Sequence, residues 1–322
     1  MMARLFLIPI LLLSLFNPAF FEEIVAAKDQ KYTLNNGASI PMVGFGTWQI
    51  QGADLIKQVL DDALAAGYRL IDSATLYGNE ADIGKALKEL LPKHNLSRKD
   101  IFITSKLSPA DHGEKAYQAL ESSLKNLDSG YIDLYLIHWP ASFALNASDP
   151  KNAELRDESW KQLVKGVKNG LTKSIGVSNY NVRHLKELLK NDHGIKPVVN
   201  QVEWHPNYHQ NELLELCKKE NILLQAYSSL GGTGNKNLLE NAEIKKIADK
   251  LGKSPAQVLL RWSLQQNIAI IPKARSAKYI KQNIDLDFII PNEDMEILNN
   301  FNQAKYIVNP NKKYIWNPDT VA

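Results

Sequence analysis

Short apolar stretches recur along this chain every few tens of residues between positions 40 and 274. Several are near-continuous runs of Ile, Leu and Val, a pattern typical of strands that are buried on both faces. The runs cover residues 40–48, 68–74, 101–107, 131–139, 173–179, 198–204, 222–228 and 268–274. We therefore expect eight strands.

Segments with helical periodicity lie between the runs. In residues 53–67 the apolar side chains recur on one helical face, and Gly67 stands where a C-terminal cap is expected. Ser254 and Pro255 indicate the start of another helix, because serine caps a helix N-terminus and proline suits the first helical position. No low-complexity linker divides the strands into two groups. Eight alternating units of strand and helix predict one barrel.

The segment before the first run predicts a further element. Asn36 and Gly37 separate two short β-prone stretches, which is a hairpin signal. A doubly wound parallel sheet is the alternative to the barrel, but no Gly-x-Gly-x-x-Gly sequence follows an early strand and opens a helix. The expected architecture is an α/β fold with one (β/α)₈ TIM barrel, preceded by a short N-terminal β-hairpin, in a single domain over residues 28–322.

Residues 1–27 have the composition of a targeting leader. Arg4 precedes an apolar run over residues 5–16, which is too short to span a bilayer comfortably. Small residues at 25–27 then match the pattern that signal peptidase prefers. We expect a cleavable signal peptide, and with it the secretory pathway, the lumen of the endoplasmic reticulum or export. The alternatives are an uncleaved anchor, or a start site wrongly assigned ahead of Lys28, in which case the protein is cytoplasmic.

Composition and charge restrict the classes of function. The chain is 44% hydrophobic and 23% charged, as expected for a soluble globular protein with a large core. A net charge of +3, without a basic stripe, gives no reason to expect nucleic acid as a partner. Cys217 is the only cysteine, so neither an intrachain disulfide nor a thiolate zinc cluster can form. It lies in an amphipathic helical pattern, which favours a buried structural thiol. We expect a monomer with no stable membrane contact beyond the leader.

Four polar residues stand at the ends of three successive apolar runs: Asp72, Tyr77, Lys106 and His138. The carboxyl ends of the strands are where barrel enzymes place their active sites. A tyrosine holds its proton with a pKa of about 10, and a nearby lysine is expected to lower that pKa while a carboxylate keeps the lysine charged. Such a set can donate a proton to a carbonyl oxygen as hydride reaches the carbon.

Other strand ends are also polar, and together they predict one polar pocket. They carry Trp48, Ser178, Asn179, Gln201, Glu203, Tyr227, Ser228 and Lys273. Simpler interpretations remain open: Asp72 and Lys106 can form a structural ion pair, His138 can be a core histidine, and Tyr77 a half-buried tyrosine. A metal-dependent barrel hydrolase is a further alternative, although lysine and tyrosine are poor neighbours for zinc. We expect no metal site.

The order of the motifs resembles the aldo-keto reductase family from about Lys31 to the C-terminus. The matching segments are GFGTW at 44–48, DSATLYGNE at 72–80, SKL at 105–107, DLYLIHWP at 133–140, GVSNY at 176–180, NQVEWHP at 200–206, AYSSLG at 226–231 and IPK at 271–273. The resemblance implies NAD(P)H-dependent reduction of aldehydes or ketones to alcohols, with the cofactor lying across the barrel mouth.

The resemblance also implies roles for individual residues. Tyr77 corresponds to the proton donor, with Asp72 and Lys106 tuning it and His138 orienting the carbonyl. The residues implied to bind the cofactor are Gly46, Thr47, Ser178, Asn179, Gln201, Tyr227, Ser228, Leu230, Gly231, Lys273, Arg275 and Asn283. Those implied to wall the substrate site are Trp48, His138, Trp139 and Trp316.

The adenosine end departs from the family pattern, which places a serine directly after the lysine and an arginine six positions after it. Here Ala274 and Tyr279 stand there. A planar, bidentate arginine suits a phosphate, so its loss weakens the case for NADP specificity. We hypothesise that Lys273 and Arg275 carry the phosphate preference, with Lys278 also close by. NADPH is the expected cofactor, and NADH is the alternative.

The substrate side departs as well. Ser108 follows the SKL motif, where many members of the family have tryptophan, and the loop after Tyr227 and the C-terminal tail are short. A broad aldehyde or dicarbonyl reductase fits these features better than a ketosteroid or prostaglandin enzyme. The alternative from another class is a regulatory protein that binds the cofactor on a reductase barrel without significant turnover.

Overall fold

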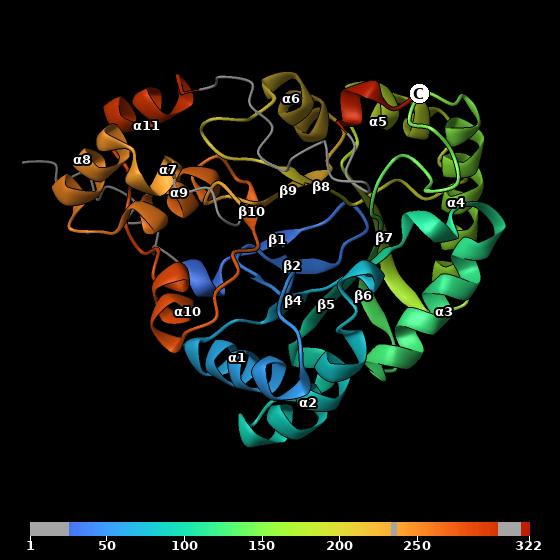
Figure 1. Cartoon of the computed structure of the whole chain (residues 1–322), viewed down its shortest axis with the longest axis horizontal. Helices are drawn as coiled ribbons and strands as arrows, with labels where there is room; N and C mark the ends of the chain where they lie inside the picture. The colour runs from blue at the N-terminus through green and yellow to red at the C-terminus, as the bar shows by residue number, and fades with distance from the viewer. Residues whose placement is uncertain (1–25, 233–236, 302–316) are drawn as a thin grey trace, which may run out of the picture.

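The computed structural model describes residues 26–232, 237–301 and 317–322. Its centre is a sheet of eight parallel strands whose spatial order follows the chain without reversal. The strands are β3 (Phe45–Gly46), β4 (Leu70–Asp72), β5 (Phe102–Leu107), β6 (Ile132–Ile137), β7 (Thr172–Ser178), β8 (Val199–Glu203), β9 (Leu223–Tyr227) and β10 (Ala269–Ile270). A parallel bridge between Val43 and Ile270 brings the two outer strands together. The predicted (β/α)₈ barrel is confirmed (Figure 1), and the doubly wound alternative is wrong.

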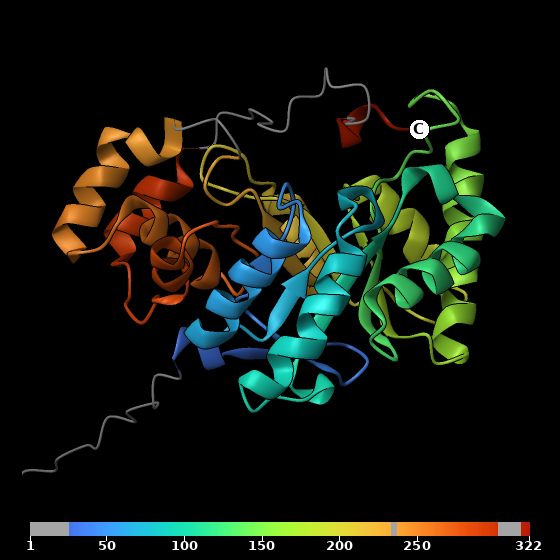
Figure 2. The ribbon, with the colours of Figure 1, turned by 60° about the horizontal axis from the view of Figure 1, so that its bottom comes forward.

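Helices surround the strands as an outer layer, which Figure 2 shows with α1 and α2 in front. They are α1 (Ala53–Ala66), α2 (Glu80–Lys93), α3 (Ala116–Leu127), α4 (Lys151–Lys168), α5 (Val182–Lys190), α6 (Asn211–Lys219), α7 (Asn237–Glu240), α8 (Ala242–Leu251), α9 (Pro255–Leu264), α10 (Ala277–Ile284) and α11 (Asn292–Asn299), with the 3₁₀ helix η2 (Thr75–Tyr77) after β4.

Both predicted helix boundaries are confirmed. After α1, Gly67 adopts the left-handed conformation at φ 103°, and its N–H bonds to carbonyls of the last helical turn. Before α9, Ser254 and Gln257 form a capping box.

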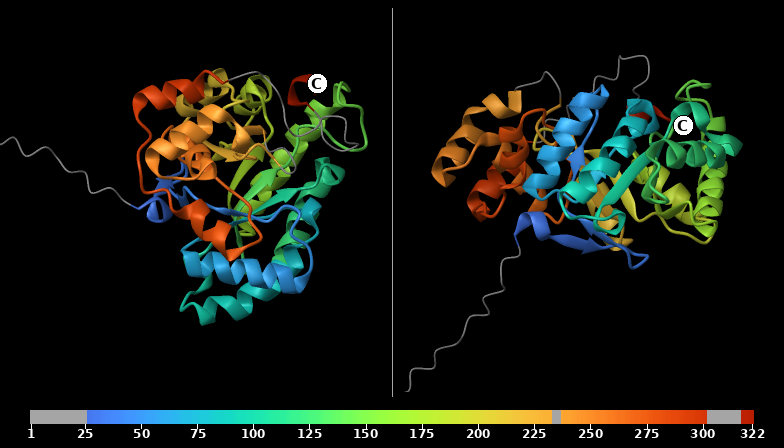
Figure 3. Two further views of the ribbon diagram at one scale, coloured as in Figure 1. Left: turned by 60° about the vertical axis from the view of Figure 1, so that its left-hand side comes forward. Right: turned by 90° about the horizontal axis from the view of Figure 1, so that it is seen from below.

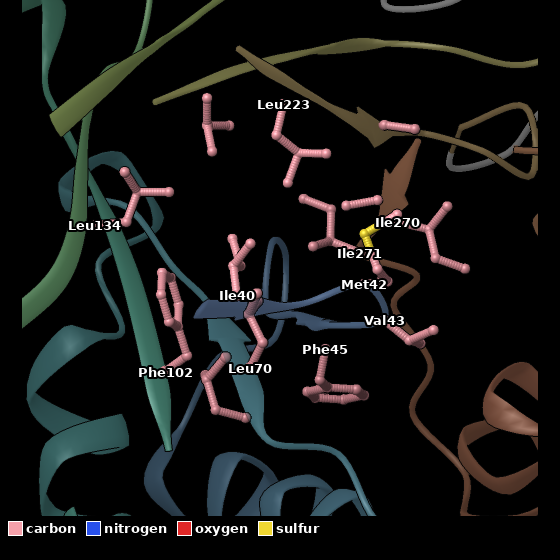
Figure 4. Packing of buried hydrophobic residues seen from close by; sticks show 14 of the residues in the cluster. Ile40, Met42, Val43, Phe45, Leu70, Phe102, Leu134, Leu223, Ile270 and Ile271 are labelled. Carbon is pink, nitrogen blue, oxygen red and sulfur yellow. The ribbon is translucent and has the colours of Figure 1, made fainter. Parts of the chain in front are cut away.

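The predicted hairpin precedes the barrel. Strands β1 (Lys31–Thr33) and β2 (Ser39–Pro41) pair antiparallel around a turn in which Gly37 has φ 83°. The hairpin crosses one end of the barrel, and the last described residues, 317–322, lie toward the other end (Figure 3). Its fully buried Ile40 lies among side chains of the barrel interior such as Leu70 and Phe102 (Figure 4). The hairpin therefore closes this end of the barrel with apolar side chains. The polar strand ends lie at the opposite end.

Cys217 is buried in α6, as predicted. Burial raises the pKa of its thiol to about 12, so the thiolate is not formed at neutral pH.

Residues 1–25, which hold most of the predicted leader, lie outside the described residues, and so does Trp316. The leader, the location that follows from it and the monomeric state therefore stay predictions. Within the described ranges, no helix is both long enough and apolar enough to span a membrane.

Candidate active site

A cavity of about 590 Å³ lies at the carboxyl ends of the strands. Its volume is in the range of small-molecule sites, roughly 300–1,000 Å³. Most of the predicted site residues line it: Gly46, Trp48, Asp72, Tyr77, His138, Trp139, Ser178, Asn179, Gln201, Tyr227, Ser228, Leu230 and Lys273. The structure thus brings together, in one place, residues that are far apart in the sequence, from Gly46 to Lys273.

The Lys106 ammonium organises the predicted catalytic group. Its Nζ donates to Asp72 Oδ1 at 2.6 Å, to the Ser73 carbonyl at 2.8 Å and to Tyr77 Oη at 3.3 Å. An ammonium has three protons, so these three acceptors use all of them. Tyr77 Oη therefore accepts from Lys106, and its own O–H is left to donate. The His138 ring meets the Tyr77 ring edge-on at 5.7 Å between centroids, which places an imidazole beside the phenol.

Burial sets the charge states in this cluster. It raises the pKa of Tyr77 well above the usual value, and the Asp72 carboxylate raises it further. The expectation that Lys106 lowers this pKa is wrong for the protein alone. Lys106 is paired with Asp72 at the shorter distance, so in the protein alone its charge offsets only part of the cost of burying a phenolate. Burial also lowers the pKa of His138 well below its usual value, and the charge on Lys106 adds to that effect. At neutral pH the site therefore holds a protonated phenol and a neutral imidazole.

One wall of the cavity is a set of mutually bonded polar side chains. Tyr227 Oη donates to Asn179 Oδ1 at 2.7 Å, and Asn179 Nδ2 donates to the His138 carbonyl at 2.9 Å. Ser178 Oγ donates to the Gln201 carbonyl at 2.8 Å. Asn179 has φ 63°, a left-handed conformation that asparagine tolerates better than most residues. These bonds hold the wall in one arrangement before any ligand binds.

Gln201 joins this wall to the Lys106 cluster. Its Nε2 donates to Asp72 Oδ2 at 2.8 Å. Its Oε1 makes no hydrogen bond within the described part of the chain, although Gln201 lines the cavity. An unpaired carbonyl oxygen at a cavity wall suits an amide N–H₂ of a ligand, such as the carboxamide of a nicotinamide.

The lining of the cavity also carries positive charge. Lys273 lines the cavity and is half-buried; its burial and the positive charge on Arg275 lower the pKa of its ammonium. Among the residues that the structure describes, Lys273 has no carboxylate partner, whereas Arg275 Nη2 donates to the Gln49 carbonyl at 2.5 Å. Two neighbouring cations without a paired anion favour binding of a phosphate.

Some predicted residues lie outside the lining. Lys106 is buried behind Tyr77. Thr47 Oγ1 donates to the Asp72 carbonyl at 2.8 Å, so it supports the backbone of the site. Arg275 is exposed, and Asn283 is buried in α10. Gly231 also lies outside the lining.

Gly46, which does line the cavity, also has a structural reason to be glycine. A Cβ there would lie 2.6 Å from the Ile271 carbonyl oxygen, too close for any other residue without a backbone shift. The close approach of β3 to the chain after β10 therefore needs this glycine.

Several lining residues were not predicted. They are Leu76, Phe143, Ser229, Gly232, Leu239, Ile271 and Pro272. Leu76, Ser229, Ile271 and Pro272 stand inside the matching segments, beside predicted site residues, so their position in those segments is a usable signal. Phe143 and Leu239 lie on a loop and a short helix with no strand-end signal.

The structure also bears on metal binding. No group of three or more His, Cys, Asp or Glu side chains within residues 26–232, 237–301 and 317–322 is placed to hold a metal ion.

Fold and site together define a barrel enzyme with a buried carboxylate–lysine–tyrosine cluster at its mouth. The chain belongs to the aldo/keto reductase family, whose sequence profile matches residues 42–303. It is therefore an oxidoreductase of a family that reduces carbonyl compounds with nicotinamide cofactors.

Individual relatives agree with this assignment. The chain is 40% identical to aldo-keto reductase family 1 member A1 of Gallus gallus, over 85% of this chain and 90% of the relative. It is 40% identical to a glyoxal reductase of Bacillus subtilis, over 85% of this chain and 93% of the relative. The crystal structure of a Bombyx mori aldo-keto reductase in complex with NADP superposes with a TM-score of 0.80, at 32% identity, and covers 90% of this chain and 98% of that one.

Proposed function

We propose that this protein reduces small aldehydes and dicarbonyl compounds to alcohols with NADPH, and that Tyr77 donates the proton. The observation that carries the proposal is the orientation of the phenol. Lys106 donates to Tyr77 Oη, so the phenolic O–H is free to donate into a cavity large enough for a small molecule. The raised pKa of Tyr77 keeps that proton in place at neutral pH.

Each residue of the cluster has one task. When bound, NADPH supplies the hydride that adds to the carbonyl carbon. Tyr77 gives its proton to the carbonyl oxygen, and the phenolate that remains lies 3.3 Å from the Lys106 ammonium, which stabilises it. The neutral His138 imidazole holds the carbonyl oxygen near the phenol by a hydrogen bond. Asp72 keeps Lys106 charged and in position.

Other residues suit the parts of the cofactor. Ser178, Asn179 and Gln201 present polar groups to a carboxamide, and Tyr227 lines the cavity where its ring would stack on a nicotinamide. Lys273 and Arg275 provide positive charge for the phosphate of the adenosine end.

The substrate class follows from the wall around Tyr77. This wall is largely apolar and consists of Trp48, Leu76, Trp139 and Phe143. Ser108, which stands where many family members have tryptophan, is itself buried and accepts the Ala110 N–H at 3.2 Å, so it does not line the cavity. An apolar wall with one proton donor favours small, uncharged carbonyl compounds, and a relative that shares 40% of its residues is named a glyoxal reductase.

The test is NADPH oxidation, followed by absorbance, with an aliphatic aldehyde, an aromatic aldehyde, a vicinal dicarbonyl and a ketosteroid. We expect turnover with the first three and little with the steroid. Tight NADPH binding with no turnover across the panel would instead support the regulatory protein that binds cofactor without reacting.

We expect Lys273→Ala and Arg275→Ala each to raise the KM for NADPH about tenfold and to leave the KM for NADH nearly unchanged. The reason is that a charge-assisted contact to the extra phosphate exists only with NADPH. Steady-state kinetics with both cofactors measures this, with Lys281→Ala, an exposed lysine of α10, as the control. Equal efficiency with both cofactors, unaffected by Lys273→Ala, would contradict the assignment.

A further inference from the structure

Gln225 is a polar side chain in the interior of the barrel, below the cavity wall. It lies on β9, is fully buried, and stands in register with Gln201 on β8. Gln201 Nε2 donates to Gln225 Oε1 at 2.8 Å, in addition to its bond with Asp72 Oδ2. Gln225 is not among the residues that line the cavity.

These two bonds fix the orientation of the Gln201 amide. A carboxylate only accepts, so Asp72 requires Nε2, and not Oε1, on its side of Gln201. Gln225 Oε1 takes the second N–H. With both hydrogens of Nε2 engaged, the amide cannot flip without losing two bonds at once, and Oε1 stays unpaired beside the cavity.

Stability does not explain a glutamine at this position. Gln225 Nε2 is buried and has no partner within the part of the chain that the structure describes. An unpaired buried N–H is unfavourable; an apolar side chain of the same size would remove it but would also remove the acceptor of one Gln201 N–H, so the net effect on stability is expected to be small. What Gln225 provides is the oxygen that accepts from Gln201.

We propose that Gln225 is a positioning residue, which holds Gln201 so that its carbonyl oxygen accepts from the carboxamide N–H₂ of the nicotinamide cofactor. This rests on the proposed function, since it concerns the same cofactor. The proposal also couples the cofactor contact to Asp72, because Gln201 Nε2 donates to both Asp72 and Gln225.

The experiment compares the affinity for NADP⁺ with that for its 3-acetylpyridine analogue, in which a methyl group replaces the amide nitrogen. Calorimetry or quenching of tryptophan fluorescence gives both dissociation constants without turnover. Wild-type protein is expected to bind the analogue about five- to tenfold more weakly, the effect of one lost hydrogen bond. Gln225→Met is expected to bind NADP⁺ more weakly by a smaller factor and to show a ratio of the two dissociation constants closer to one than wild type, because Asp72 still accepts one N–H of Gln201.

Two further variants make the result decisive. Gln225→Glu keeps an oxygen that accepts from Gln201, so it is expected to restore the wild-type ratio. Gln225→Leu repeats the test if the methionine variant does not fold. The melting temperature of the apolar variants is expected to stay close to that of wild type, because one unpaired N–H is removed and one Gln201 N–H loses its acceptor.

The outcomes distinguish the positioning role of Gln225 from the proposed function of the protein. If wild type discriminates between the ligands and the apolar variants discriminate equally, the role of Gln225 is wrong while the proposed function stands. A lower melting temperature with an unchanged ratio would show a merely structural role. A wild-type protein that binds neither NADP⁺ nor the analogue would overturn the proposed function itself.

Discussion

Tyr77→Phe is expected to lower kcat for aldehyde reduction by about a hundredfold or more, and to leave the affinity for NADPH unchanged. The change removes one oxygen from a ring that keeps its place against His138 and under the Lys106 ammonium. The proton donor is lost, while the polar wall around Gln201 and the cation Lys273 are untouched. Single-turnover kinetics with a reactive aldehyde, together with direct NADPH titration, measures the two effects separately.

Tyr68→Phe is the matched control for this experiment. Tyr68 is also buried, and its Oη donates to the Ile280 carbonyl at 3.2 Å, away from the cavity. Its removal is expected to change turnover by less than about twofold. If Tyr77→Phe retained a substantial share of wild-type kcat, another group, with His138 the nearest, would have to supply the proton.

The fold could be predicted because burial of parallel strands is visible in the sequence. A strand covered on both faces has to be apolar along its whole length, and such runs repeat here with helical patterns between them. The extent to which each strand pairs with its neighbours was harder to predict from the sequence. Strands β3 and β10 are two residues long, although their apolar runs, 40–48 and 268–274, are several times longer. Apolar composition reports burial, whereas strand length depends on which backbone groups meet a neighbour.

The candidate catalytic group could be predicted because its residues interrupt the apolar pattern. Asp72, Lys106 and His138 are polar residues where apolar runs end, and a barrel gathers such ends at one place. Phe143 and Leu239 could not be found this way, because they reach the cavity from segments without a strand. Gln225 was missed inside an apolar run, yet alternation of Leu223, Gln225 and Tyr227 puts it on the inward face.

The pKa of Tyr77 illustrates what sequence leaves undetermined. Proximity of a lysine suggests a lowered pKa, but the sign depends on how deeply the phenol is buried and on how much of the lysine charge is already paired. Asp72 lies 2.6 Å from Lys106, closer than Tyr77 does. Burial and distances of this kind come only from the folded structure, and here burial above all reverses the expected direction.

Lys106→Met is expected to remove turnover and also to lower the free energy of unfolding by about 3–5 kcal/mol. The side chains of Lys106 and Asp72 are almost wholly buried, so losing the ammonium leaves a carboxylate inside the barrel without its counter-charge. Urea denaturation followed by fluorescence measures the stability. As a control, Lys57→Met breaks an ion pair with Glu89 whose side chains are both about half exposed, and no measurable loss is expected.

The double variant Asp72→Asn/Lys106→Met distinguishes a structural ion pair from a catalytic one. Removing both charges eliminates the unpaired carboxylate, and the asparagine can still offer an oxygen to the Gln201 N–H, so most of the stability is expected to return. Turnover is not expected to return, because the phenolate of Tyr77 would form without a cation beside it. A double variant that recovers both stability and kcat would mean that the pair serves only the fold. Recovery of stability alone would assign the Lys106 charge to the reaction.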